Sequence, residues 1–492
     1  MYNVHLTHSL LCFEFVEFTL IYNVSLKWQA HVFLIEDLLM LKKTFLLLAG
    51  LAMAFAAQAQ DFLGAWSGKL DLGAAKLTLV FHFSKDDAGK LKCAMDSPDQ
   101  GAKGISAEAE MTTEGKLRVT VSALGMSYEA QVSDNRMEGT FSQGGMQLPL
   151  VLTPGEAAPN RPQTPTSPYM YPIEEVTFTN PADGAKLAGT LTYPMNFQFS
   201  KDVPVLVMVT GSGQQNRDEE VFNHKPFLVI ADFLAKQGIA TLRYDDRGVG
   251  GSTGEVANAT TLDFMGDALA ALDYVRSTGK FGKCGVLGHS EGGTIAMMIA
   301  ARQKCDFAVS MAGGAIRGDS ILLLQNHAAL SKSGVPAMVC DDYVTALRQV
   351  LRWMESGEQV SNPKERIAEV VKSANLQLPD ALEENLVKVI EMSVPWLRAF
   401  LSLDPAEDIR KATCPVFALN GDNDTQVPAK ENLGAFRRLL PANDKSLVKE
   451  YPGLNHLFQH SQTGLPIEYG TIEETISPEV LQDIATWVNS VK

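Results

Sequence analysis

Hydrophobic and polar positions follow two different patterns, one before and one after a proline-rich segment. From Asp61 to Thr153, short runs alternate apolar and polar residues, as in Lys76–Phe83, and turn residues such as Asp86–Gly89 separate the runs. Because successive side chains of a strand point to opposite faces of a sheet, this pattern predicts short antiparallel strands. Residues 60–153 are therefore expected to form a small all-β domain, either a barrel or a sandwich.

The segment 154–172 is rich in proline, together with Asn, Gln, Ser and Thr, and shows no apolar periodicity. This composition is typical of a semi-rigid linker.

From residue 173 onward, continuous apolar runs alternate with helical patterns. After a leading hairpin, the expected strands are Val203–Val209, Ala240–Tyr244, Cys284–Leu287, Phe307–Met311 and Val416–Leu419. The expected helices between them include Phe227–Gln237 and Thr261–Ser277. Apolar strands separated by helices predict a doubly wound, mostly parallel α/β sheet over residues 173–492. Ligands bind beyond the carboxyl ends of such strands.

Strand signals are absent between Arg317 and Asp408, where helical stretches such as Asp342–Glu355 and Pro363–Ala374 occur. An insertion of this length between two strands predicts a helical cap over the site, at about 317–408. The alternative is a structural excursion on the far face of the sheet.

The segment Gly288–Gly293 carries the strongest chemical signal. It follows a short apolar run and precedes a small, apolar helical pattern. In that context a G-x-S-x-G sequence indicates a strained turn that holds a serine hydroxyl out of the sheet. Ser290 is the candidate nucleophile, and the alternative is an ordinary glycine-rich turn.

A carboxylate and a histidine follow later strands of the predicted sheet. The loop after Val416–Leu419 contains Asp422 and Asp424, and its spacing puts Asp424 on the turn, so that Asp424 is the candidate acid. Asp422 is expected to bond loop backbone, a common use of Asp in turns. His456, in the loop after the last expected strand, is the candidate base, with His460 as its nearest rival.

An oxyanion site requires hydrogen-bond donors near the serine. The expected donors are the backbone N–H of Glu291 and one N–H from the loop after the first buried strand. Gly213 or Gln214 is favoured there, and Ser212 stays open. His289 is interpreted as the variable residue of the serine turn.

The order Ser290, Asp424, His456 is that of the α/β-hydrolase fold. From about Glu174 to its end, the chain resembles bacterial serine carboxylesterases of the α/β-hydrolase superfamily that carry a Gly-His-Ser-Glu-Gly-Gly elbow. The motifs that carry this resemblance are the elbow itself, Gly211–Gly213 followed by Asn216–Glu219, and Arg243–Gly248. The resemblance implies hydrolysis of short acyl esters through an acyl-enzyme, with these three residues as the triad and with no metal or organic cofactor.

Two groups of charged residues near these motifs have two interpretations each. Arg217, Asp218, Asp245, Asp246 and Arg247 either contact a polar substrate or, as we favour, form an ion-pair network that holds the oxyanion loop. The side chain of Glu291 either meets a substrate amine or accepts hydrogen bonds from the surrounding loops.

The sequence at the start of the chain predicts a targeting segment. A short positive stretch at Met40–Lys43, the apolar run Thr44–Phe55 and the cleavage signal Ala57–Ala59 predict a signal peptide over 40–59. The mature chain is then expected to start at Gln60, to be periplasmic or secreted, and to contain no membrane span. Residues 1–39 are interpreted as an upstream extension before the true initiator Met40. The alternative is an anchoring helix at Ser9–Leu26, where two glutamates would be costly in hydrocarbon.

Composition narrows the classes of function. The net charge of −15, without a visible Lys or Arg cluster, argues against nucleic-acid binding. The six cysteines include no C-x-x-C pair, which argues against a zinc site or a disulfide framework.

The sequence thus predicts a carboxylesterase acting on a small-molecule ester. A serine peptidase of aminopeptidase or oligopeptidase type on the same fold is the first alternative, and a non-catalytic binding protein is the second. The N-terminal β domain, which has no catalytic constellation, is expected to be structural or to bind a carbohydrate surface.

Overall fold

The computed structural model describes residues 62–492 except 74–75, 87, 101, 134, 157–159, 196, 198–202 and 393. The predicted upstream extension, signal peptide and mature start therefore lie outside the described residues. The described chain divides near residue 160 into two compact units.

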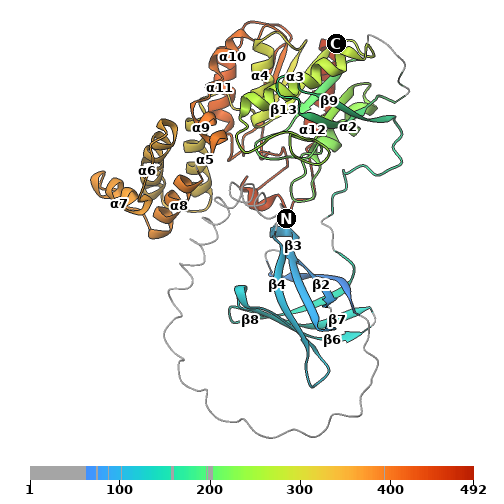
Figure 1. The fold of residues 1–492 in the computed structure, drawn as a ribbon, viewed down its shortest axis with the longest axis vertical. Helices are drawn as coiled ribbons and strands as arrows, with labels where there is room; N and C mark the ends of the chain where they lie inside the picture. Colours follow the sequence, from blue (N-terminus) through green and yellow to red (C-terminus); the bar gives the residue numbers. More distant parts are fainter. Residues whose placement is uncertain are drawn as a thin grey trace. The chain divides into compact units, whose positions relative to one another are not determined.

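The first unit is a closed β barrel in which neighbouring strands pair antiparallel. Its strands appear in blue and cyan in Figure 1. In chain order they are β1 Gly64–Asp71, β2 Lys76–Lys85, β3 Leu91–Ser97, β4 Ala102–Met111, β5 Leu117–Val121, β6 Met126–Ser133, β7 Arg136–Gln143 and β8 Met146–Pro154. The predicted all-β class is confirmed, and of the two expected architectures the domain forms the barrel.

Alternating residues of these strands fill the barrel interior. The buried side chains include Trp66, Phe81 and Tyr128, and the Tyr128 hydroxyl lies 3.1 Å from the carbonyl oxygens of both Met137 and Leu150. The interior therefore serves as the hydrophobic core of this unit.

The second unit contains an eight-stranded sheet in the order β16-β15-β14-β13-β11-β12-β10-β9. The leading hairpin, β9 and β10, pairs antiparallel, and β11 to β16 pair parallel, so the predicted mostly parallel sheet is confirmed. The strands are β9 Ile173–Thr179, β10 Lys186–Thr192, β11 Val205–Val209, β12 Ala240–Tyr244, β13 Cys284–His289, β14 Ala308–Met311, β15 Val416–Gly421 and β16 Leu447–Tyr451.

Helices cover both faces of this sheet (Figure 1). Successive residues of one strand, such as Val207 and Met208 in β11, belong to different cores because they point to opposite faces. The core on one face includes α3 Thr261–Ser277, α4 Glu291–Ala301 and α11 Ala429–Leu439, and the core on the other includes α2 Pro226–Lys236 and α12 Pro478–Val491.

The predicted helical insertion lies between β14 and β15. It consists of α5 Gly318–Lys332, α6 Ala337–Ser356, α7 Pro363–Ser373, α8 Asp380–Glu391, α9 Pro395–Ser402 and α10 Ala406–Lys411. Helices α5 to α9 share a hydrophobic core of their own, whereas Ile409 of α10 belongs to the core of the sheet. We call α5 to α9 the cap. Within the described part of the chain, no helix has both the length and the apolar character needed to cross a membrane.

Candidate active site

Ser290 lies at the turn between β13 and α4, with φ 54° and ψ −119°. Residues with a side chain rarely adopt this conformation, and it is the strained turn expected for an exposed nucleophile. The glycines around it are sterically required. A Cβ on Gly288 would lie 1.9 Å from the carbonyl oxygen of Gly292, and a Cβ on Gly292 would lie 2.1 Å from that of Val209. Strand and helix therefore pack closely around the serine.

Asp424 and His456 come together from two separate loops. Asp424 follows β15, His456 lies between β16 and α12, and His456 Nδ1 is 2.7 Å from Asp424 Oδ2. Asp424 Oδ1 accepts the backbone N–H groups of Gln426 and Val427 at 2.8 and 2.9 Å, which fixes the carboxylate. Both side chains are buried, with 0% of the Asp424 side chain and 5% of the His456 side chain exposed. A carboxylate at Nδ1 directs a proton to that nitrogen and leaves Nε2 as an acceptor.

The alternative acid and base lie elsewhere. Asp422 Oδ1 accepts the backbone N–H of Gly453 at 2.6 Å, which is the expected turn contact. His460 Nδ1 pairs with Glu474 Oε2 at 2.8 Å, and 67% of the His460 side chain is exposed. Of the candidate acids and bases, Asp424 and His456 therefore contact each other, and their catalytic roles stay predictions.

The loop after β11 passes directly beside the serine. A Cβ on Gly211 would lie 3.1 Å from the Cβ of Ser290. The backbone N–H of Gly211 donates to Glu219 Oε1 at 2.7 Å, so Gly211 does not supply an oxyanion donor. The N–H groups of Gly213, Gln214 and Glu291 meet no acceptor among the residues that the structure describes, and the oxyanion role of each stays a prediction.

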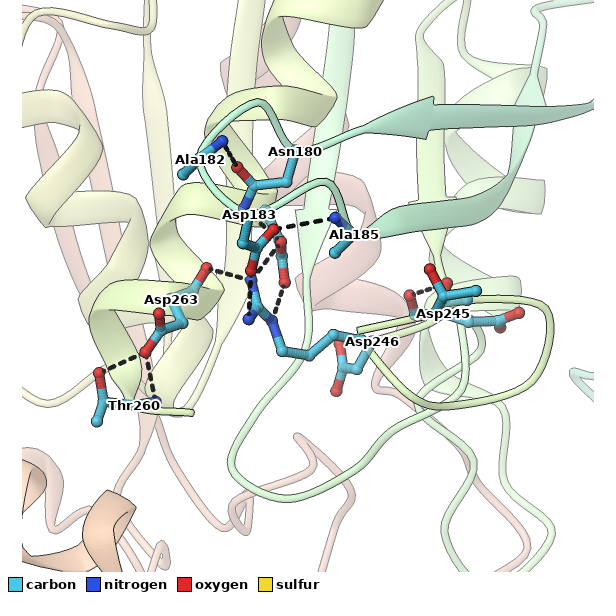
Figure 2. Close-up of polar contacts among 12 residues, drawn as sticks. Asn180, Ala182, Asp183, Ala185, Asp245, Asp246, Thr260 and Asp263 are labelled. Atoms are coloured by element: carbon cyan, nitrogen blue, oxygen red, sulfur yellow. Dashed lines mark hydrogen bonds and ion pairs between the residues drawn. The ribbon is translucent and has the colours of Figure 1, made fainter. Parts of the chain in front are cut away.

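The charged residues near this loop form matched pairs. Arg217 binds Asp245 through Nε at 3.0 Å and Nη2 at 2.8 Å, Arg243 pairs with Asp218, and Arg247 binds both oxygens of Asp267 at 2.8 Å. Figure 2 shows the part of this network around Asp183, which pairs with Arg247, and around Thr260, which caps α3 through Asp263. The favoured interpretation, a network that holds the loops in place, agrees with these contacts.

Asp246 is hydrogen-bonded to two positions of the loop after β11. Its Oδ1 accepts the Thr210 hydroxyl at 2.7 Å and its Oδ2 accepts the Gln215 N–H at 2.9 Å. Burial raises the pKa of Asp246 to about 8, and the charges of Glu219 and Glu291 add to this effect. Asp246 is therefore expected to be protonated at neutral pH.

The Glu291 carboxylate connects the serine turn to the cap. Its Oε1 accepts the Thr261 hydroxyl at 2.6 Å and the indole N–H of Trp396, in α9, at 2.9 Å. Burial raises the pKa of Glu291. Of the two interpretations of this side chain, the contacts agree with hydrogen bonding to neighbouring segments.

Sequence reasoning missed the contacts of His289 and Glu219. His289 Nδ1 lies 3.0 Å from Glu219 Oε1, and His289 Nε2 lies 2.9 Å from the backbone carbonyl oxygen of His456. His289 was interpreted only as the variable residue of the turn. Glu219 was visible in the motif Asn216–Glu219, but no spacing in the sequence indicates its partner, 70 positions away.

Comparison with known proteins gives a family match over the same region. Residues 225–462 match the family model described as serine aminopeptidase, S33. The matched range contains Ser290, Asp424 and His456 and excludes the β barrel.

Among curated proteins, esterase EstD of Thermotoga maritima is 25% identical over 307 residues. The alignment covers 61% of this chain and 65% of the relative, so the chain spans slightly less than two thirds of that protein's length.

Similar solved structures include Est1E from Butyrivibrio proteoclasticus, with 17% identity, a TM-score of 0.36, and coverage of 64% of this chain and 98% of that chain. They also include proline iminopeptidase of Mycobacterium smegmatis, with 15% identity, a TM-score of 0.39, and coverage of 65% and 98%. The sheet order, the strained serine turn between strand and helix, and the matched family model together identify the larger unit. The larger unit has the α/β-hydrolase fold.

Proposed function

We propose that this protein is a serine hydrolase that cleaves small carboxylic esters through an acyl-enzyme intermediate. The observation that carries the proposal is the buried hydrogen bond between Asp424 and His456, in the same unit as a serine in a strained strand-to-helix turn. The ring centroids of His289 and His456 are 4.7 Å apart, which brings the candidate base next to the residue that precedes Ser290.

In the proposed reaction, Ser290 Oγ attacks the ester carbonyl carbon while His456 Nε2 takes the hydroxyl proton. Asp424 holds the ring by its Nδ1–H and stabilises the imidazolium that forms. The backbone N–H of Glu291, with that of Gly213 or Gln214, stabilises the negative charge on the carbonyl oxygen. His456 then gives its proton to the leaving alkoxide, and a water molecule activated by His456 releases the acid and regenerates Ser290.

The test is turnover of p-nitrophenyl esters across acyl lengths by the parent and by Ser290→Ala, Asp424→Asn and His456→Ala. Each substitution is expected to lower kcat by roughly 10³-fold or more, because triad members act as a unit. Asp422→Asn and His460→Ala are matched controls from the same loops. Full activity in Ser290→Ala, or equal losses in the controls, would contradict the proposal.

A peptidase is the second candidate, because the matched family model is described as a serine aminopeptidase. Amino-acid nitroanilides compared with p-nitrophenyl esters distinguish the two, and faster turnover of the anilides would overturn the ester assignment.

An export signal at 40–59 supports a periplasmic or secreted location as part of the same proposal.

A further inference from the structure

His289 is enclosed by hydrogen-bond acceptors on both sides of its ring. Nδ1 faces Glu219 Oε1 at 3.0 Å, and Nε2 faces the carbonyl oxygen of His456 at 2.9 Å. Both side chains of the pair are almost completely buried, with 8% of His289 and 6% of Glu219 exposed. No part of this arrangement is needed to explain the attack by Ser290 or the proton transfer by His456.

The two contacts constrain the protonation state of the ring. A backbone carbonyl can only accept, so Nε2 must carry a hydrogen. Glu219 Oε1 already accepts the N–H of Gly211 at 2.7 Å, and a carboxylate oxygen in this position accepts from Nδ1 as well. With Glu219 as a carboxylate, both ring nitrogens carry hydrogens, and the pair is an imidazolium against a carboxylate.

The electrostatic surroundings agree with this state. Burial by itself lowers the pKa of His289, but the charge and hydrogen bond of Glu219 outweigh it, and the pKa is raised overall. The His456 carbonyl and the charge of Asp424 act in the same direction. Asp246 lies near enough to Glu219 for the charge of Glu219 to affect the pKa of Asp246. Because that pKa is raised to about 8, Asp246 is neutral at neutral pH.

The pair joins three segments that carry separate parts of the site. Glu219 holds the oxyanion loop through the Gly211 N–H, His289 precedes Ser290 in the chain, and the His456 carbonyl belongs to the residue that would act as base. Glu219 adopts φ 52°, and Ser290, the residue after His289, adopts φ 54°. The backbone is therefore strained at Glu219 and directly after its partner His289. Strain of this kind persists where surrounding contacts hold it in place.

We propose that the Glu219–His289 pair is a second histidine–carboxylate unit, which positions the oxyanion loop and the His456 backbone against Ser290 only while His289 is an imidazolium. This role rests on the proposed serine hydrolase function. Glu219 and His289 are positioning residues, because neither is required to touch the reacting atoms. Loss of the His289 proton as the pH rises removes one of the two N–H donors and loosens either the oxyanion loop or the His456 backbone.

The first measurement is ¹⁵N NMR of the histidine side chains in the full chain at pH 7. The His289 signals are assigned by their absence in His289→Gln. We expect both His289 ring nitrogens to show the shifts of protonated nitrogens. An unprotonated Nδ1 would overturn the proposal. This readout does not depend on any activity.

The second measurement is the pH profile of kcat for Glu219→Gln, with Glu220→Gln as the matched control. The glutamine keeps an oxygen for the Gly211 N–H but removes the charge, so His289 loses its proton at a lower pH. We expect the alkaline decline of kcat to move to lower pH, with kcat at pH 8 falling roughly 10- to 100-fold while KM changes little. The control, whose side chain is at the surface near Lys225, should retain the parent profile.

An unchanged alkaline limb in Glu219→Gln would overturn the positioning role. If the parent turns over no ester, the proposed function fails. The positioning role can then still be tested by comparing the pH dependence of fluorophosphonate labelling of Ser290 in the parent, Glu219→Gln and Glu220→Gln. The two failures are therefore distinguishable.

Discussion

Asp424 uses its two carboxylate oxygens for different purposes. Oδ1 accepts two backbone N–H groups of its own loop, and Oδ2 faces His456 Nδ1. An asparagine at this position would have to turn its NH₂ group toward one of these donors, so either the loop or the ring would lose its acceptor. The backbone of the loop thus fixes the carboxylate, and this short turn can thereby orient the His456 ring, 32 positions away in the chain.

Asp246 gives a prediction about stability and pH. The folded chain keeps its carboxyl group protonated up to about pH 8, whereas the unfolded chain releases the proton near pH 4. Between these values the folded state binds the extra proton, so rising pH favours unfolding, by up to about 1.4 kcal/mol per pH unit. The substitution Asp246→Asn removes the titrating carboxyl group but keeps both contacts, because the amide can still accept the Gln215 N–H and can donate to the Thr210 hydroxyl.

We therefore expect the thermal unfolding midpoint of the parent to fall more steeply from pH 6 to pH 8 than that of Asp246→Asn. Circular dichroism over this pH range measures the difference. Parallel slopes for the two proteins would show that Asp246 is ionised in the folded state.

At the scale of the elements, a hydrogen bond attaches the α9 helix of the cap to the serine turn. The Trp396 indole donates to Glu291, and its ring stacks on Phe400 with 5.3 Å between centroids. Leu397 and Leu401 of the same helix are buried in the cap core. Because Glu291 follows Ser290 directly, the position of α9 and the geometry of the turn depend on each other.

Trp396→Phe tests this connection. The substitution keeps an aromatic ring and removes the N–H, which leaves a buried acceptor with one partner fewer. Such a loss costs on the order of 1–3 kcal/mol, so we expect kcat/KM for p-nitrophenyl esters to fall by about tenfold. Trp353→Phe, in the cap core beside Arg366, is the matched control. Equal effects of the two substitutions would mean that the contact with Glu291 has no special role.

The elements also show what the sequence could and could not predict. The sheet, the hairpin and the serine turn follow from local patterns, because apolar runs and the glycines around Ser290 determine them within a few residues. The link between Glu219 and His289 exists because β11 and β13 are neighbours in the sheet, although Ala240–Tyr244 lies between them in the chain. Similarly, Trp396 meets Glu291 across 105 positions, through the packing of a cap whose internal order no periodicity reveals.

At the scale of the whole molecule, each of the two units has a hydrophobic core of its own. Every residue placed in the candidate site belongs to the unit that begins at Arg161, and the β barrel has a core of its own. A closed barrel pairs its edge strands with each other, which favours independent folding.

Deletion of residues 62–153 is therefore expected to keep kcat for p-nitrophenyl acetate within about twofold of the parent, as for domains with separate cores. The same deletion variant can be tested on polymeric esters. If the barrel binds a carbohydrate surface, its removal should raise KM for these polymeric substrates. Loss of activity on the small ester in a variant with a native circular dichroism spectrum would show that catalysis depends on the barrel.

The proposed role of Ser290 as nucleophile is tested by covalent labelling of the full chain with a fluorophosphonate, with the modified residue located by peptide mass spectrometry. The proposed triad predicts a single label on Ser290, no label in Ser290→Ala and much slower labelling in His456→Ala. A label on another serine, or labelling of Ser290 at an unchanged rate without His456, would contradict it.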